Sequence, residues 1–520
     1  SRRQRQMCIR DRQYYICVVL IVFLFLLFFH EIIRDYKSIK HPFRRILLCL
    51  VLTLVFKYNY GIFFYGLEYE DAYVFSFCAR QFSYDIFPTS FLIDAVSVGS
   101  LTEPLLTSTY GGHFIMYPTY LSLFTKVLGW SPTILSLANT IIAFFVLLIL
   151  SVFSKEQKFW FIPPIIYCCA PIINLFATCF LSEIFSSFIC LIFVYTYFRE
   201  KGVYNYILCL ISFLVAIMCK RENLALLSLP AIEFIYLTFL KYRCNIKNHI
   251  TELLKYIPFL FILCIYFMCI QNVFNIETIE SKDIENATFS TRYMAILLPA
   301  FIKAMFGFEA FTLVLIITIA WIVYFYIRYK RITKSIAFPL ILFCAYLILY
   351  TAHYRGYFFI QEKQVSSFET YRYINNFFYL IPLVFISLRC KFIRQIKLIA
   401  CIVLAISLFN TYSLRLKMSE TEYRDRFYEA QTVRDYIQAN STKSVLICEN
   451  ILLYQNICDD NFDVCDIRLY DKLDKNHHTD YYILLSDLNY LKERYSLNID
   501  LHDVYPVMSL GERKYLYKCK

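Results

Sequence analysis

Three carboxylates stand close together where a long apolar run ends. The stretch GLEYEDAYVFSFCAR, residues 66–80, holds Glu68, Glu70 and Asp71 within four positions. Carboxylates at such a place can cap the helix that follows and complement its dipole, or can simply be solvated in a loop. They can also act as a general base, because a carboxylate held near a substrate hydroxyl in a partly dry site removes its proton. The spacing alone leaves these three interpretations open.

Basic side chains stand near the ends of other apolar runs. The segment KREN, residues 220–223, follows one such run and leads directly into LALLSLP. A basic group at the end of a membrane span either extends its charged head to the interface or binds an anion. Guanidinium groups suit bidentate contacts with phosphate. The candidate phosphate ligands are Lys220, Arg221, Arg292 and Arg372.

Two acids lie within apolar runs themselves. Glu183 in LSEIF falls near the end of a predicted span, and Glu233 in PAIEF falls deeper in another. Ionisable residues inside a membrane are costly and are commonly functional. Glu183 is therefore a further candidate for contact with donor or acceptor.

The elements that must position these residues are membrane helices. Hydrophobic residues form 59% of the 520 positions and aromatic residues 19%, whereas charged residues form only 18%. With 51 Phe and 45 Tyr but only 10 Gly, the composition is typical of a polytopic α-helical membrane protein and excludes a soluble core. About twelve spans are predicted, at 14–29, 46–65, 132–152, 160–179, 181–198, 204–219, 224–240, 253–270, 308–327, 336–352, 373–388 and 396–413.

The short basic loops predict the orientation. Basic residues recur at every second connection, for example Arg34 to Arg45, Arg199 with Lys201, and Arg328 to Lys334. Because cytoplasmic loops are enriched in Lys and Arg, these connections are expected in the cytoplasm. The loop at 66–131, the segment KREN and everything after about residue 414 are then extracytoplasmic. The net charge of +12 has the same explanation, so no nucleic-acid partner is predicted.

The chain divides into four parts. Residues 1–12 have no periodicity and are interpreted as a non-native, adapter-like segment, and 13–45 form an extra apolar segment and a basic loop, crossing or re-entrant. A membrane domain covers 46–413, in which the loop 66–131 carries two interfacial amphipathic helices. The tail, 414–520, is predicted to be a small α/β domain. Its cysteines could pair in an oxidising compartment.

The order and common sidedness of these motifs resemble the GT-C class of membrane glycosyltransferases, which includes protein O-mannosyltransferases and lipid A aminoarabinose transferases. The resemblance covers residues 46 to about 413 and has four short motifs. They are the acidic pair in EDAYVF, HFIMYP at 113–118, the basic residues before ENLALLSLP, and the late pair Arg372 and Tyr373. The family pair is commonly Asp then Glu, whereas this chain has Glu70 then Asp71, so which of the two is the base stays open.

The resemblance implies a function. It implies an inverting transfer of a sugar from a polyprenyl-phosphate donor to a glycolipid, glycan or protein on the extracytoplasmic face of the cell membrane. Glu70 or Asp71 would be the base, and Glu68, His113, Tyr117, Tyr373 and Glu183 would contact donor or acceptor. No metal ligands are assigned, although dependence on a divalent metal ion stays open. The alternative from another class is a lipid or glycan transporter, or flippase, with an extracellular domain.

Overall fold

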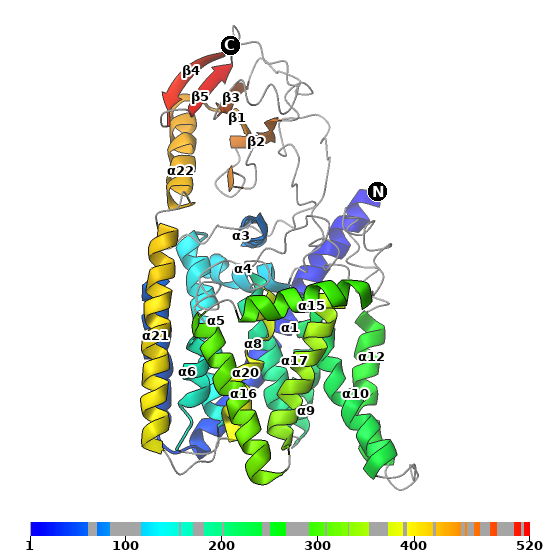
Figure 1. Ribbon diagram of the computed structural model, residues 1–520. Coiled ribbons are helices and arrows are strands. Elements are labelled where there is room, and N and C mark those ends of the chain that lie inside the picture. The colour runs from blue at the N-terminus through cyan, green and yellow to red at the C-terminus, as the bar shows by residue number, and fades with distance from the viewer. Residues whose placement is uncertain are drawn as a thin grey trace.

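The computed structural model of the chain consists of a helical bundle with a small sheet domain at one end (Figure 1). The part of the chain described comprises residues 2–60, 70–83, 116–154, 158–169, 181–199, 202–241, 250–266, 291–306, 309–330, 332–352, 373–387, 393–419, 423–448, 453–454, 462–467, 479–485, 504–510 and 514–519. The end of the bundle that carries the sheet is called the sheet end below. The predicted fold class, a polytopic helical membrane protein with a small α/β C-terminal domain, is confirmed.

Most described helices belong to the bundle. They are α1 (Arg2–Ser38), α2 (Pro42–Tyr60), α5 (Pro132–Phe153), α6 (Ile162–Cys168), α8 (Ser182–Arg199), α9 (Val203–Cys219), η1 (Arg221–Leu227), α10 (Ser228–Ile235), η2 (Tyr236–Lys241), α11 (Ile250–Leu254), α12 (Ile257–Ile265), α16 (Glu309–Tyr329), α17 (Lys334–Ala352), α20 (Leu380–Leu383), η5 (Val384–Ser387) and α21 (Ile393–Ser419). Within the described part, five helical segments are long and apolar enough to cross a membrane, at Tyr14–Ser38, Pro132–Phe153, Arg221–Phe239, Thr312–Tyr329 and Lys334–Ala352. These are the helices of a multi-pass membrane protein.

Helix α8 lies at the centre of the bundle. Every residue from Ser182 to Tyr197 is buried, and the helix packs against both α5 and α9. A helix that is apolar on nearly all sides belongs inside a bundle, because each face needs a protein or lipid neighbour. The few polar side chains of α8 must therefore find their partners within the protein.

Three helices lie across the sheet end instead of along the bundle. They are α3 (Glu70–Ser83), α4 (Met116–Leu128) and α15 (Thr291–Met305) (Figure 1). Helices α3 and α4 fall where interfacial helices are predicted, at 72–82 and 113–129. Helix α3 packs on α4, which in turn packs on α5. Together α3 and α4 cover part of this end of the bundle.

The C-terminal domain consists of α22 (Tyr423–Asn440) and a five-stranded sheet of order β2-β1-β3-β5-β4. The strands are β1 (Ser444–Cys448), β2 (Phe462–Asp466), β3 (Asp480–Leu485), β4 (Val504–Ser509) and β5 (Tyr515–Cys519). Strand β1 pairs in parallel with β2 and β3, and β5 pairs antiparallel with β3 and β4. Cys448, Cys465 and Cys519 are free thiols, so among the described residues this domain has no disulfide.

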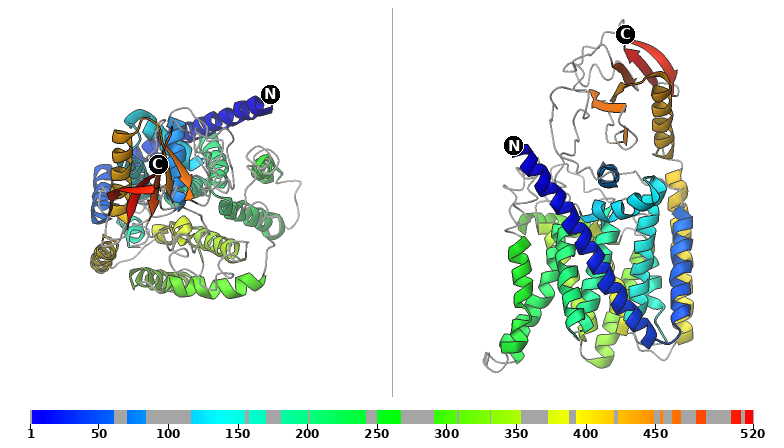
Figure 2. Two further views of the ribbon diagram at one scale, coloured as in Figure 1. Left: turned by 90° about the horizontal axis from the view of Figure 1, so that it is seen from above. Right: turned by 180° about the vertical axis from the view of Figure 1, so that it is seen from behind.

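Helices α1 and α6 correspond to two of the predicted spans. Helix α1 begins at Arg2 and crosses the whole bundle from the sheet end, so it is not re-entrant (Figure 2). The helical backbone includes residues 2–12, whose non-native origin stays a prediction. In the predicted span 160–179, Pro163 and Pro164 fall at the start of α6, where a missing amide hydrogen costs little. Residues 170–180 of that span lie outside the described part.

Candidate functional site

Four polar side chains lie on one face of the first half of α8, a largely apolar helix. Glu183, Ser186, Ser187 and Cys190, here called the α8 polar stripe, follow the i, i+3, i+4, i+7 spacing that places residues on one side of a helix. All four are buried. The stripe begins in the first turn of α8, near the sheet end, and its members contact the 220–223 turn, the 373–377 segment and α17.

The first contact is an ion pair. Lys220 Nζ donates to Glu183 Oε1 at 2.6 Å, and both side chains are almost fully buried. Lys220 is the C-terminal cap of α9 and has extended backbone angles, so the chain turns there before η1 begins. A buried Lys needs a carboxylate partner because the cost of removing its charge from water is large. Two residues that are each predicted as site candidates are thereby joined.

The second contact runs through Asn223, one turn beyond Lys220. Its Nδ2 donates to Ser186 Oγ at 2.8 Å and to the carbonyl of Ala216 at 2.7 Å. Its Oδ1 accepts from Tyr346 Oη at 2.9 Å and from Asn376 Nδ2 at 3.1 Å. These bonds join η1, α8, α9, α17 and the 373–377 segment. Asn223 therefore fixes the turn that carries Lys220 and Arg221.

The third contact holds the 373–377 segment. Ser187 Oγ lies 2.9 Å from the carbonyl oxygen of Asn375 and 3.1 Å from that of Asn376. The last member of the stripe, Cys190, has its Sγ 3.5 Å from Tyr346 Oη. The α8 polar stripe and its partners form one polar cluster from four parts of the chain that are far apart in sequence. These partners are Lys220, Asn223, Tyr346, Asn375 and Asn376.

The predicted acidic pair opens α3. Glu70 and Asp71 are the first two residues of that helix, where negative charge complements the helix dipole. Their side chains, and all of Glu68, lie outside the described part of the structure. Helix α3 is linked to α8, the helix of the polar stripe, by packed aromatic rings. Phe75 packs edge-on against Tyr117 of α4 at 5.1 Å, and Tyr117 lies 6.0 Å from Phe185 of α8.

The other predicted site residues are distributed around this end of the bundle. Arg221 and Arg292 are exposed, at the first residue of η1 and at the second of α15. Tyr117 is buried, and its hydroxyl donates to Asn139 Oδ1 at 3.0 Å, which makes it a packing residue of α4 and α5. Tyr373 is 8% exposed, with its ring 5.1 Å from that of Tyr350. His113 and Arg372 lie outside the described residues.

Several members of the cluster are absent from the sequence-based candidates. Asn223 is the last residue of KREN, in which only the basic residues are predicted ligands, and Tyr346, Asn375 and Asn376 come from predicted spans outside the quoted motifs. Two features of the sequence indicate these residues. One is the polar stripe within an apolar helix, and the other is the pair of adjacent asparagines, NN, within an apolar span. Polar residues inside a membrane span are unusual enough to mark a site.

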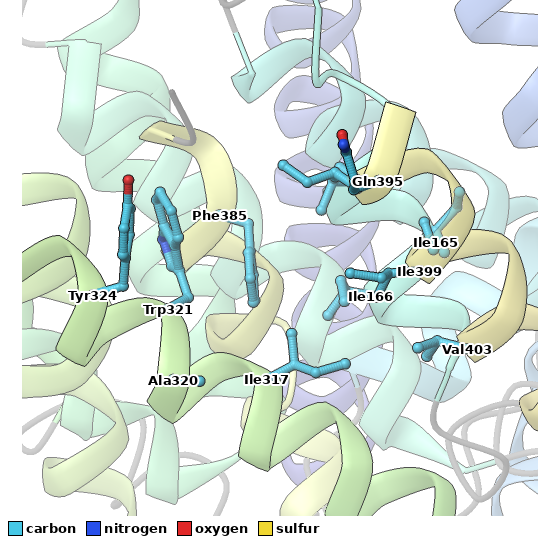
Figure 3. A pocket seen from close by; sticks show the side chains of 13 residues that line it. Ile165, Ile166, Ile317, Ala320, Trp321, Tyr324, Phe385, Gln395, Ile399 and Val403 are labelled. Atoms are coloured by element: carbon cyan, nitrogen blue, oxygen red, sulfur yellow. The ribbon is translucent and has the colours of Figure 1, made fainter. Parts of the chain in front are cut away.

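A groove lined by apolar side chains opens beside the stretch Tyr373–Ile386. It has a volume of about 450 Å³ and lies between α6, α16, η5 and α21. Figure 3 shows Tyr324, Trp321 and Phe385 side by side along one wall, facing Ile165, Ile166 and Ile399. Phe385 belongs to the stretch that begins at Tyr373, so the groove and the polar cluster share one stretch of chain.

Within the described residues, no group of three or more His, Cys, Asp or Glu side chains could hold a metal ion. The side chains of Glu70 and Asp71 are not among those residues. The dependence on a divalent metal ion stays open.

Comparison with known proteins gives a likeness of fold only. No protein-family model matches the chain, and no curated protein matches it. Two crystal structures of ArnT from Cupriavidus metallidurans, one bound to undecaprenyl phosphate and one in the apo state, each cover 91% of this chain and 97% of their own. The sequence identity is 14% in both cases, with TM-scores of 0.48 and 0.47. The chemistry of this chain has to be inferred from its own residues.

Proposed function

We propose that the chain is an inverting glycosyltransferase of the GT-C type. It would move a sugar from a polyprenyl-phosphate donor to an acceptor at the sheet end, which would face the extracytoplasmic side of the membrane. The observation that carries this proposal is the buried Lys220–Glu183 pair. Lys220 caps α9, which packs against α4, and α4 in turn packs against α3, the helix that begins with Glu70 and Asp71. A buried cation and a helix that begins with two acids thus lie at the same end of the bundle.

The transfer needs a base and a cation. The base, Glu70 or Asp71, would take the proton from an acceptor hydroxyl, and the acceptor oxygen would attack the anomeric carbon. The bond between that carbon and the phosphate oxygen then breaks, and its electron pair leaves with the lipid phosphate. Attack from the side opposite the leaving group inverts the anomeric centre.

Lys220 is suited to stabilise the leaving group. Its ammonium has three N–H donors, and among the described residues the bond to Glu183 uses one of them. Negative charge increases on the phosphate oxygen as the bond breaks, so a fixed cation there lowers the barrier. The exposed guanidinium of Arg221, next in the chain, would approach the same phosphate from the surface.

The lipid part of the donor has a candidate path. The groove between α6, α16, η5 and α21 is lined almost entirely by apolar side chains. It shares the stretch Tyr373–Ile386 with the polar cluster. A polyprenyl chain is an apolar, extended ligand, so we propose that it occupies this groove while its phosphate reaches the cluster.

Consumption of a lipid-linked sugar by the purified protein is the direct test. Radiolabelled polyprenyl-phosphate hexoses would be supplied, and Glu70→Gln and Asp71→Asn compared with the wild type. Loss of a general base commonly costs 10²–10⁴-fold in rate, so we expect a decrease of at least about 100-fold in one of the two variants.

Asp435→Asn is the matched control. Asp435 is an exposed carboxylate of α22, paired with the adjacent Arg434, and its loss is expected to leave the rate unchanged. A wild-type protein that consumes no lipid-linked sugar, or full activity in both acidic-pair variants, would contradict the proposed function.

A further inference from the structure

The segment after Tyr373 is a broken helix with two asparagines at its start. Residues 373–377 are helical, 378–379 form a turn, and α20 and η5 follow. Pro382 has no amide hydrogen to donate to the carbonyl of Phe378, which is bonded instead by the amide of Ile381 at 2.9 Å. Broken helices within membrane bundles are tolerated where they border a cavity or a site.

Asn375 is buried without side-chain partners. Its side chain is 0% exposed, and within the described structure neither Oδ1 nor Nδ2 has a hydrogen-bond partner. The amide could make several hydrogen bonds, and burying it with none is unfavourable. Its backbone carbonyl accepts a hydrogen bond from Ser187 Oγ at 2.9 Å. The bond to the backbone carbonyl keeps the residue in place, whereas its side chain has no partner among the described residues.

The neighbouring asparagines differ from Asn375. Asn223 uses both of its polar atoms in four hydrogen bonds. Asn376 donates to Asn223 Oδ1 and to Tyr350 Oη at 3.2 Å, while its own Oδ1 has no partner among the described residues. Among these three asparagines, the unmet hydrogen-bonding capacity lies on the side-chain amide of Asn375 and on Asn376 Oδ1.

We propose that Asn375, together with Asn376 Oδ1, recognises hydroxyl groups of the sugar carried by the lipid donor. This inference rests on the proposed function and adds the residues that select the sugar. A sugar hydroxyl both donates and accepts, and the side chain of Asn375 offers both kinds of group. The site adjoins Asn223, which fixes the turn of Lys220, so a sugar there would sit next to the phosphate.

The location also explains why the amide is unpaired. A site built to hydrogen-bond a hydroxyl discriminates strongly against ligands that lack it, because its buried polar groups are then left unsatisfied. Such a site is less stable when empty than an apolar replacement would be, since functional sites commonly reduce stability.

Binding and stability of Asn375→Leu separate these roles. The probes are polyprenyl phosphate without a sugar and with a hexose or a deoxyhexose, each measured with the purified full chain. We expect the affinity for the sugar-free lipid to stay within about twofold, and the affinity for the hexose-bearing lipid to fall about tenfold. The variant should no longer distinguish hexose from deoxyhexose. Its thermal midpoint should rise, because an unpaired buried amide has been removed.

Two other asparagines serve as controls. Asn205 is buried, its Nδ2 donates to the carbonyl of Thr196 at 2.8 Å, and its Oδ1 has no partner among the described residues. Because it lies at the opposite end of the bundle, Asn205→Leu should leave sugar selectivity unchanged. Asn223→Leu should lower the thermal midpoint because it removes four hydrogen bonds.

The outcomes distinguish this inference from the proposed function. If Asn375→Leu keeps the wild-type selectivity for hexose over deoxyhexose, the inference is wrong and the proposed function stands. The same conclusion follows if its thermal midpoint falls and its affinities for the sugar-free and the sugar-bearing lipid fall equally. A wild-type protein that neither consumes a donor nor prefers the sugar-bearing lipid overturns the proposed function and this inference with it.

Discussion

At the scale of single residues, the buried pair of Lys220 and Glu183 has two separable roles. The pair links the end of α9 to the start of α8, and it holds a cation where the proposed phosphate would sit. A buried ion pair is often no more stabilising than an apolar replacement of both partners, although removing one partner is strongly destabilising. Stability and activity should therefore respond differently to single and double substitutions.

Lys220→Met should destabilise the protein by about 3–5 kcal/mol, because it leaves the Glu183 carboxylate buried without its cation. The double variant Lys220→Met with Glu183→Leu should recover most of that loss. Denaturant titration in detergent would measure both. If Lys220 stabilises the leaving phosphate, transfer activity stays low in the double variant although its stability returns. An active double variant would show that the pair is structural only.

At the scale of elements, α1 is bonded to other helices near both ends of the bundle. Near the sheet end, Tyr14 Oη lies 3.0 Å from Ser122 Oγ of α4, and its ring stacks on Phe82 of α3 at 4.7 Å. Near the opposite end, Arg199 of α8 forms ion pairs with Asp35 and with Glu31. Helix α1 therefore connects the interfacial helices that carry the acidic pair to the central helix that carries the polar stripe.

Arg199→Met tests how strongly α1 is held. Glu31 and Asp35 are 1% and 5% exposed, so their carboxylates would lose a cation inside the protein. We expect a loss of about 2–4 kcal/mol in the same denaturant titration. Arg434→Met removes an exposed pair and is the control, with an expected change of about 0–1 kcal/mol. Equal effects of the two substitutions would contradict a structural role for the α1 contact.

At the scale of the whole molecule, charge is distributed unequally between the two ends of the bundle. Opposite the sheet end, Lys37 lies in the last turn of α1, Lys40 in the turn that follows and Arg44 in the first turn of α2, and Lys330 lies between α16 and α17. Positive loops are retained in the cytoplasm during insertion. The proposed site and the C-terminal domain would then share the extracytoplasmic side, where a lipid-linked donor is needed.

Reporter fusions measure this orientation. Alkaline phosphatase attached after residue 520 should be active, since it would be exported, whereas a fluorescent protein there should be dark. A chain ended after Lys330 should give the reverse result. Fluorescence from the fusion after residue 520 would place the sheet domain in the cytoplasm and would contradict the proposed side of the reaction.

Local patterns in the sequence predicted much of this architecture. The apolar runs located the helices, and α3 begins at Glu70, where the acidic pair follows an apolar run. The prediction was less accurate for α1, which continues to Ser38, past the predicted end at residue 29. The polar residues after Phe29 resemble a loop in sequence, whereas ion pairs to α8 hold them in a helix.

The sequence by itself determined that the chain is a helical membrane bundle with a small α/β domain and an unequal distribution of charge. It also marked Lys220 and Glu183 as separate candidates. Only the tertiary structure decided that these two side chains are paired, that Asn223 meets Asn376, and that Asn375 has no side-chain partner among the described residues. Residues 223 and 376 are far apart in the chain. Their contact depends on how each helix is rotated and placed against its neighbours, which local periodicity does not specify.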